Sequence, residues 1–255
     1  MRAIVGSHFV VCQWRGNLAL RVVPVLLLLS SVFSFASDVD ELVLSAQRAY
    51  SAKRYEEALE SYGRAASLGS PTALFQLGAM HERGEGVDRN ILEAAKWYER
   101  ATDAGSVTAA KRLANMYYDG EGVPKDFGRA ASLYRRAGDL GDSNSFFTLG
   151  QMYWRGSRGE REPAKAVEVF TKAAERGNPL AMNALGIAYR FGDGVDKSDS
   201  AAYAYFKLAH EFGSILAADN LGKLTTLISD SDRSAGEKLL EHLRHKISTG
   251  PRKAN

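Results

Sequence analysis

Cysteine is almost absent from this chain of 255 residues, since the only thiol is that of Cys12. A disulfide needs two cysteines, so no intrachain disulfide holds the fold together. Cys12 also lies in an N-terminal segment that has the features of a leader. We therefore expect the exported protein to contain no thiol chemistry and to owe its stability to packing alone.

Long hydrophobic runs are missing as well. The apolar segment 22–35 contains Pro24 and is shorter than the ~20 residues that cross a bilayer. It follows three arginines in a stretch without acidic residues, and it ends at the small residues Ser34 and Ala36. This order is typical of a secretory signal peptide. We expect residues 1–36 to be a signal peptide cleaved after Ala36, not a membrane anchor, and the protein to be periplasmic in a bacterium or secreted otherwise.

The chain also lacks a large excess of positive or negative charge. The chain has 33 basic and 30 acidic residues, and three of the basic residues belong to the leader. The mature chain would therefore be close to neutral. A neutral chain offers no electrostatic basis for binding nucleic acid, and we expect no nucleic-acid partner.

Residues for catalysis or metal binding are also sparse. Among the five histidines, His81 stands where other copies of a repeat have tyrosine, and His242 and His245 would need further ligands to hold a metal. No serine or cysteine stands in a recognisable nucleophile motif, and the acidic loops do not match a calcium loop. We expect no enzyme activity, no metal and no cofactor.

What the sequence does contain is a repeat of 36 residues. Blocks that begin at Pro71, Val107, Ser143, Pro179 and Ile215 align in columns of leucine, alanine, aromatic residues and glycine. The aromatic column holds Tyr98, Tyr134, Phe170 and Phe206, and one alanine column holds Ala94, Ala130, Ala166 and Ala202.

Each block has the pattern of two helices. Ala109, Leu113 and Met116 follow the spacing of one helix face, and a second face of this kind follows within the same block. Glycine ends each helix. Small alanines let helix backbones approach closely, while the aromatic column fills the space beside them. The sequence therefore predicts an all-α fold, a right-handed α-solenoid of antiparallel helix pairs.

The paired glycines of "LGAMHERGEGV", residues 77–87, raise the alternative of a phosphate loop. Such a loop follows a strand and precedes a helix N-terminus. Here Gly84 and Gly86 stand between two predicted helices, and the pattern recurs at Gly120 and Gly122. We therefore interpret the glycines as turn residues.

These motifs resemble those of the Sel-one-like repeat, a relative of the tetratricopeptide repeat. The resemblance rests on "ALFQLGAMHERGEGVDRN" with "EAAKWYERATDAG", and on "AAKRLANMYYDGEGVPKD" with "RAASLYRRAGDLG". It implies four repeats, at 71–106, 107–142, 143–178 and 179–214. The third copy departs from the pattern because its second glycine is shifted to Gly159.

The ends of the repeat region are less regular. Residues 37–70 look like a tetratricopeptide unit that caps the N-terminal end, with a turn at Ala52–Arg54. Residues 215–247 read as a degenerate capping repeat, because the loop and aromatic pattern is lost there; a terminal repeat must show a polar outer face to water. Residues 248–255 are expected to be a disordered tail.

The resemblance implies a protein-interaction scaffold, and stacked helix pairs form a long surface suited to that role. We expect a protein or peptide partner on the concave face lined by the first helix of each pair, with no integral membrane anchor after cleavage. The alternatives left open are a regulator of an envelope complex and a protein that binds or hydrolyses cell-wall material, such as peptidoglycan fragments or β-lactams. The predicted groove residues are Phe75, Lys111, Asn115, Tyr118, Phe147, Gln151, Trp154 and Arg190.

Overall fold

The computed structural model describes the backbone of residues 25–157 and 159–249, which form twelve helices and contain no strand. The chain divides into two compact units, Met1–Asp38 and Val39–Asn255. Helix α1 crosses the predicted cleavage position after Ala36, while residues 1–24 of the predicted leader lie outside the described residues. None of the helices in the described residues is long and apolar enough to span a membrane.

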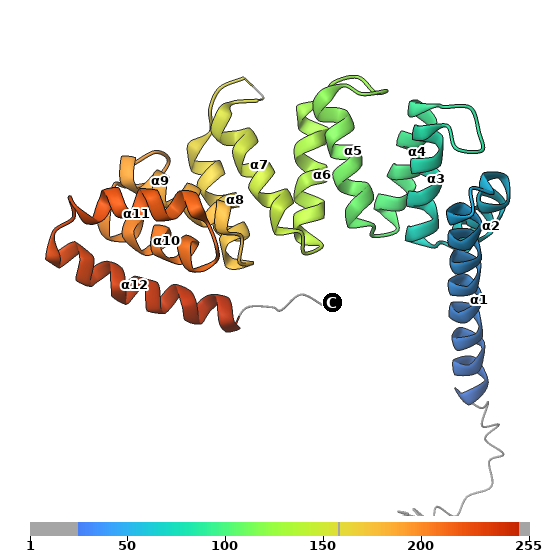
Figure 1. The fold of residues 1–255 in the computed structure, drawn as a ribbon, viewed down its shortest axis with the longest axis horizontal. Coiled ribbons are helices and arrows are strands. Elements are labelled where there is room, and N and C mark those ends of the chain that lie inside the picture. Colours follow the sequence, from blue (N-terminus) through green and yellow to red (C-terminus); the bar gives the residue numbers. More distant parts are fainter. Residues whose placement is uncertain (1–24, 158, 250–255) are drawn as a thin grey trace, which may run out of the picture. The chain divides into compact units, whose positions relative to one another are not determined.

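The helices follow one another with short connections (Figure 1). They are α1 (Val25–Ser51), α2 (Tyr55–Ser67), α3 (Pro71–Arg83), α4 (Ile91–Asp103), α5 (Val107–Asp119), α6 (Phe127–Asp139), α7 (Ser143–Arg155), α8 (Pro163–Glu175), α9 (Pro179–Phe191), α10 (Asp199–Glu211), α11 (Ile215–Thr225) and α12 (Asp230–Thr249). We call α3, α5, α7, α9 and α11 the helices A, and α4, α6, α8 and α10 the helices B. Repeat positions are counted from the first residue of each helix A.

The helix boundaries follow from capping residues that recur in every repeat. Each helix A is preceded by a side chain that accepts a hydrogen bond from the third amide of the helix; these residues are Ser70, Ser106, Asp142, Asn178 and Ser214. The first four helices A end at a glycine with φ between 71° and 78°, a conformation that costs glycine little. The glycine loops are therefore turns between helices A and B, as the sequence predicts.

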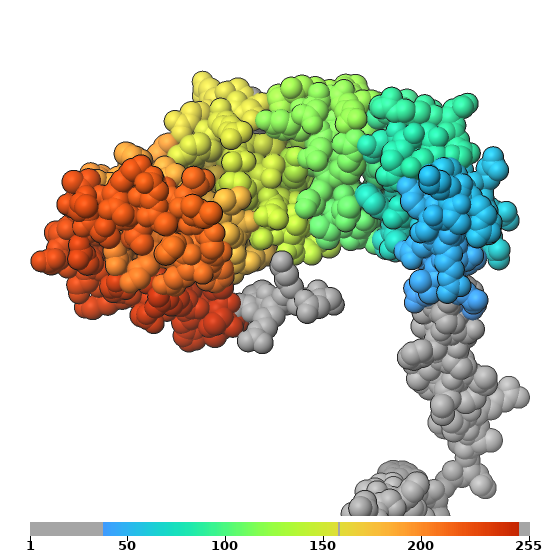
Figure 2. All heavy atoms as spheres, viewed as in Figure 1, coloured from blue at the N-terminus to red at the C-terminus, as the bar shows by residue number. Residues whose placement is uncertain are grey.

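The helices pack in consecutive pairs, and each helix B also contacts the next helix A. In the space-filling view the repeats of Val39–Asn255 succeed one another in chain order (Figure 2). The column of aromatic residues is buried throughout, at Tyr62, Tyr98, Tyr134, Phe170 and Phe206. The fold is thus an all-α helical repeat solenoid, which confirms the predicted fold class.

Close approach within a pair depends on the residue at repeat position 8. A Cβ atom added at Gly78 would lie 2.7 Å from Cε1 of Tyr98, so the aromatic ring of helix B occupies the space that a side chain on helix A would need. Gly150 and Gly186 face the rings of Phe170 and Phe206 in the same way. The glycine of helix A and the aromatic residue of helix B therefore form one packing unit.

The C-terminal end packs differently from the repeats before it. Helix α12 continues to Thr249, beyond the predicted start of the tail at 248, and it packs against α10 instead of pairing with α11. The physical reason is the loss of the packing columns, since Lys238 and His245 replace alanines and His242 replaces the aromatic residue. Without those residues α12 has nothing to insert against Gly222, which has no atom within 4 Å of its added Cβ.

Candidate partner-binding surface

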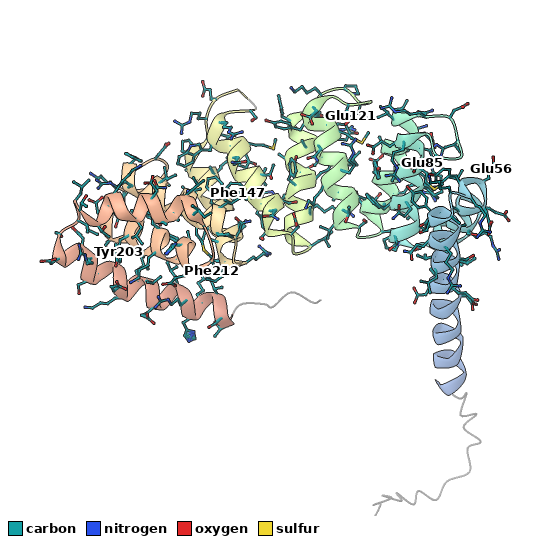
Figure 3. The ribbon with its side chains drawn as sticks, viewed as in Figure 1. Glu56, Glu85, Glu121, Phe147, Tyr203 and Phe212 are labelled. Atoms are coloured by element: carbon teal, nitrogen blue, oxygen red, sulfur yellow. The ribbon has the colours of Figure 1, made fainter. Side chains whose placement is uncertain are left out.

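The predicted groove residues, called the stripe below, stand at repeat positions 5, 9 and 12. Three of its aromatic members, Phe75, Phe147 and Trp154, lie beside the aromatic residue of their own helix B. The ring of Phe75 is 5.4 Å from that of Tyr98. In the third repeat, Phe147 on α7 (Figure 3) and Trp154 both contact Phe170, at 5.8 Å and 6.0 Å between ring centroids. The structure thus brings Phe147 and Trp154 together around one buried ring, and all three stripe residues are half-buried.

In the second repeat the predicted residues combine packing with polar contacts. Tyr118 packs edge-on against Phe127, with 5.2 Å between the rings, and its hydroxyl lies 3.4 Å from Oγ of Ser157 in the next repeat. Lys111 pairs with Asp142, the residue that caps the start of α7, at 3.3 Å. Tyr118 thus reaches the loop after α7, and Lys111 reaches the residue just before α7.

The remaining predicted residues differ in exposure. Asn115 is exposed, and its Oδ1 accepts a hydrogen bond from the hydroxyl of Tyr134; burial raises the pKa of that phenol to about 12. Arg190 donates to Asp199 at 2.6 Å, and Gln151 is half-buried. Some of the predicted residues therefore pack inside the fold, and others are exposed at its surface.

A charged network follows the same stripe at Glu82. Tyr98 donates to Oε2 of Glu82 at 2.6 Å, and Arg112 of the next repeat donates to both carboxylate oxygens. Burial raises the pKa of Glu82, but the bonds from Arg112 and Tyr98 outweigh it and hold that pKa below its ordinary value. Arg112 also donates to Glu121 at 2.9 Å, so one guanidinium links α3 to α5 and to the loop that follows α5.

Repeat positions 2 and 13 form a surface that the predicted stripe missed. In the first three repeats these positions hold polar residues: Thr72 and Arg83, Thr108 and Asp119, Asn144 and Arg155. In the last two they hold Leu180 and Phe191, and Leu216 and Leu227, which are 42%, 75%, 66% and 69% exposed. The change from polar to apolar is visible in the aligned blocks, but the predicted groove residues all stand at positions 5, 9 and 12.

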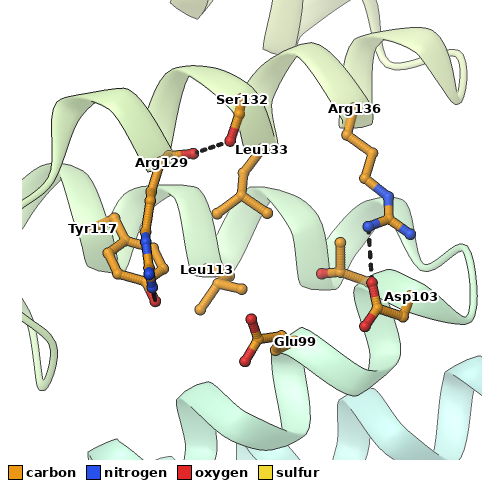
Figure 4. Close-up of a pocket in the computed structure, with 9 residues that line it drawn as sticks. Glu99, Asp103, Leu113, Tyr117, Arg129, Ser132, Leu133 and Arg136 are labelled. Carbon is orange, nitrogen blue, oxygen red and sulfur yellow. Dashed lines mark hydrogen bonds and ion pairs between the residues drawn. The ribbon is translucent and has the colours of Figure 1, made fainter.

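A separate groove of about 230 Å³ lies between α4 and α6, on the side of the helices B (Figure 4). Its walls combine apolar residues with charges of both signs. It is lined by Glu99, Thr102, Asp103, Leu113, Tyr117, Arg129, Ser132, Leu133 and Arg136. Arg136 pairs with Asp103 at 2.9 Å, and Arg129 donates to the hydroxyl of Tyr117 at 2.8 Å.

Side chains that bind metals do not gather in the part of the chain that the structure describes, where no group of three or more His, Cys, Asp or Glu is close enough to hold an ion. His81 stacks on Trp97, with 6.3 Å between the rings, which is the packing position expected from the repeat. His242 and His245 are exposed on α12.

The comparison with known families agrees with the repeat geometry. The family model of the Sel1 repeat matches residues 71–106, 107–142, 147–178 and 179–210, which together make up more than half of the chain. The chain belongs to the Sel1 repeat family. The matched segments start at the first residue of a helix A in three of four repeats and at Phe147 in the third, where the loop after the helix also departs from the pattern.

Two solved structures illustrate the likeness of this Sel1 repeat protein to others. A Sel1 repeat protein from Oxalobacter formigenes is 29% identical, with a TM-score of 0.57 over 74% of this chain and 79% of that one. A protective antigen present in uropathogenic Escherichia coli strains, displaying the same fold, is 33% identical, with a TM-score of 0.57 over 76% of this chain. The match spans only 41% of the antigen. No curated protein matches the chain.

Proposed function

We propose that this Sel1 repeat protein is an exported, non-enzymatic scaffold that binds a partner protein on the exposed face of its helices A. The observation that carries the proposal is the change at repeat positions 2 and 13. Packing does not require apolar residues at these positions, because three repeats fold with polar residues there. Large exposed apolar side chains on consecutive repeats are typical of interaction sites.

Phe191 is the strongest single anchor on this face. Its side chain is 75% exposed at the end of α9, and aromatic anchors contribute strongly when a partner covers them. Leu180 stands at the other end of the same helix, so a partner segment lying along α9 would cover both. The half-buried Tyr118 and Trp154 belong to helices A of earlier repeats and are proposed to extend the contact.

The experiment is affinity capture from an extract of the native envelope. The test variant carries Leu180→Thr and Phe191→Arg, which restore the residues of the first repeat at these positions. The matched control is Leu140→Ser, which removes an exposed leucine of similar accessibility from the end of a helix B. We expect the wild type and the control to capture the same protein and the test variant to lose it. Equal capture by all three places the partner elsewhere.

A second variant addresses the predicted stripe. Tyr118→Ala with Trp154→Ala removes contacts to Phe127 and Phe170 as well as surface, so its helicity and melting temperature are measured beside capture. Loss of capture at unchanged melting temperature supports a role of the stripe in binding. Capture of no protein, with retention on isolated peptidoglycan, favours the cell-wall alternative.

A further inference from the structure

Within the residues that the structure describes, α11 is a helix A without a helix B of its own, because α12 packs against α10 instead (Figure 1). In the third repeat, the ring of Phe170 on α8 lies beside positions 5, 8 and 12 of α7. In the last repeat these positions hold Asp219, Gly222 and Thr226, and all three are exposed. The side of α11 that a helix B covers in the third repeat is therefore open.

A row of four residues at intervals of four runs along this open side. Ile215 at one end is 87% exposed, and Leu227 at the other end is 69% exposed. Between them, Asp219 accepts a hydrogen bond from Lys223 at 2.6 Å, and both side chains are exposed. The amide of Leu227 donates to the carbonyl oxygen of Leu224 at 2.9 Å, so the backbone turns on past the end of α11. Residues four apart are neighbours on a helix surface, so the row is apolar, acidic, basic and apolar in that order.

This order of residues distinguishes α11 from the other helices A. Positions 1, 5, 9 and 13 hold Pro, Phe, Ala and Arg in the first repeat and Val, Lys, Asn and Asp in the second. They hold Ser, Phe, Gln and Arg in the third repeat and Pro, Asn, Ile and Phe in the fourth. In α11 alone, reversing the row places an apolar residue opposite each apolar residue and a base opposite the acid.

Two copies of the row therefore fit each other when they lie side by side in opposite directions. The pair Ile215 and Leu227 and the pair Asp219 and Lys223 are both centred on position 221, so a single two-fold axis brings both pairs into register. Rows of residues four apart align in this way when two helices cross at about −50°, the commonest class of helix packing. A two-fold interface requires a patch that is complementary to itself, and this row meets that requirement in shape of pattern and in charge.

We propose that α11 pairs with α11 of a second copy of the chain, on the side that the missing helix B leaves open. Ile215 then packs on Leu227 of the second copy, and Asp219 pairs with Lys223 of the second copy. Each of these contacts occurs twice because of the two-fold axis. Since a single pair of helices buries less surface than a standard protein interface, we expect a dissociation constant on the order of micromolar.

The proposed dimer is distinct from the proposed binding of a partner protein. The row shares only Leu227 with repeat positions 2 and 13, whose members on α9 are Leu180 and Phe191. A dimer carries two copies of the α9 face, and a bivalent scaffold binds a clustered partner more tightly than a single chain does. The dimer itself needs no partner protein, so it is tested with the purified chain alone.

The first experiment measures the mass of the protein, purified from its native cells, by sedimentation velocity over about a hundred-fold range of concentration. We expect a monomer in dilute solution and a dimer in concentrated solution. Ile215→Ser with Leu227→Ser should weaken the dimer about ten-fold or more. The matched control is Leu140→Ser, which removes an exposed leucine outside α11 and should leave the dissociation constant unchanged. Leu180→Thr with Phe191→Arg should also leave it unchanged, so that failure of the dimer and failure of the partner site are seen separately.

Reversal of the charges tests the register of the row. Asp219→Lys places two bases opposite each other in both contacts, and Lys223→Asp places two acids there, so each single variant should weaken the dimer about ten-fold or more. The double variant exchanges the two charges and should dimerise as the wild type does. A mixture of the two single variants should form a mixed dimer, because one chain then supplies two bases and the other supplies two acids.

Introduced cysteines locate the contact. Cys12 is the only thiol in the sequence, and a chain with Ile215→Cys and Leu227→Cys should form an intermolecular disulfide under mild oxidation. Ile215→Cys alone is the control. It should not form this disulfide, because the two copies of position 215 lie about 18 Å apart along the row, whereas a disulfide joins Cα atoms about 4.4–6.8 Å apart.

A wild type that stays monomeric at every concentration would overturn the proposal, and so would a dimer that survives the single charge reversals or that the charge exchange does not restore. Loss of the dimer in the Leu180→Thr, Phe191→Arg variant would assign the contact to α9 and contradict pairing through α11. A monomeric wild type whose partner capture is lost with Ile215→Ser and Leu227→Ser would assign the row to the partner protein instead. Circular dichroism of each variant checks that the helices are retained.

Discussion

The hydroxyl of Tyr98 donates a hydrogen bond of 2.6 Å to Oε2 of Glu82, so the aromatic residue that packs a helix pair also holds the carboxylate that joins it to the next pair. Arg112 of the following repeat donates to the same carboxylate. The stability of a solenoid is approximately the sum of the stabilities of its single repeats and of the interfaces between neighbouring repeats. Glu82 contributes to both, because it is bonded within its own repeat and across the interface.

Glu82→Gln is expected to lower the free energy of unfolding by about 2 kcal/mol at neutral pH, since charge-assisted bonds contribute more than neutral ones. The bonds from Arg112 and Tyr98 lower the folded pKa of Glu82 against the effect of burial. Its stabilisation is therefore present above the unfolded pKa, about 4.3, and is lost as the pH falls through the folded pKa. Urea unfolding at several pH values measures this. A difference between wild type and variant that grows below pH 4 would contradict the role given to Glu82.

Gly78→Ala and Gly222→Ala make the same chemical change at the same repeat position in two environments. At Gly78 the new methyl group meets the ring of Tyr98 at 2.7 Å, and overpacking of this kind costs about 1–3 kcal/mol. At Gly222 nothing lies within 4 Å, so the better helix propensity of alanine should stabilise by up to about 1 kcal/mol. Thermal melts of both variants give the comparison; destabilisation at Gly222 equal to that at Gly78 would mean that α11 pairs with a helix as α3 does.

Leu240→Ala tests the unusual position of α12. Leu240 is fully buried, and removal of a buried leucine side chain costs about 2–5 kcal/mol. Because repeats depend mainly on their neighbours, we expect hydrogen exchange to accelerate in α10 and α12 and to stay unchanged in α3 and α4. The exposed Leu216→Ala is the control and should change stability by less than about 0.5 kcal/mol. Uniform acceleration through the whole chain would show that the solenoid unfolds as one unit.

The repeat architecture was predictable from the sequence because each packing column has one physical duty in every copy. A small residue at position 8 leaves room for the aromatic residue at position 28, as Gly78 does for Tyr98 and Gly150 for Phe170, and the second repeat has Ala114 with Tyr134 in these columns. The same reasoning does not give the position of α12. Loss of the columns indicates that a helix no longer packs on α11, but it does not indicate that the helix turns back onto α10.

Surface residues were harder to assign from spacing. Phe147 and Trp154 follow the period of an exposed stripe, yet both rings contact Phe170. Helical spacing gives the direction of a side chain relative to its own helix, whereas the distance to the partner helix decides whether that direction is covered. The change to Leu180 and Phe191 at positions 2 and 13 is visible in the aligned blocks, but only the structure shows that both side chains are exposed.

The most direct test of a partner site on the helices A is photocrosslinking in the native cell. A photoreactive p-benzoylphenylalanine replaces Phe191 in one strain and Leu140, at the end of a helix B, in another. Both side chains are exposed, Phe191 to 75% and Leu140 to 46%, so either position can react in a chance collision. We expect a single defined adduct from position 191 and none from position 140. No adduct from position 191, or the same adducts from both positions, would contradict a partner site on this face.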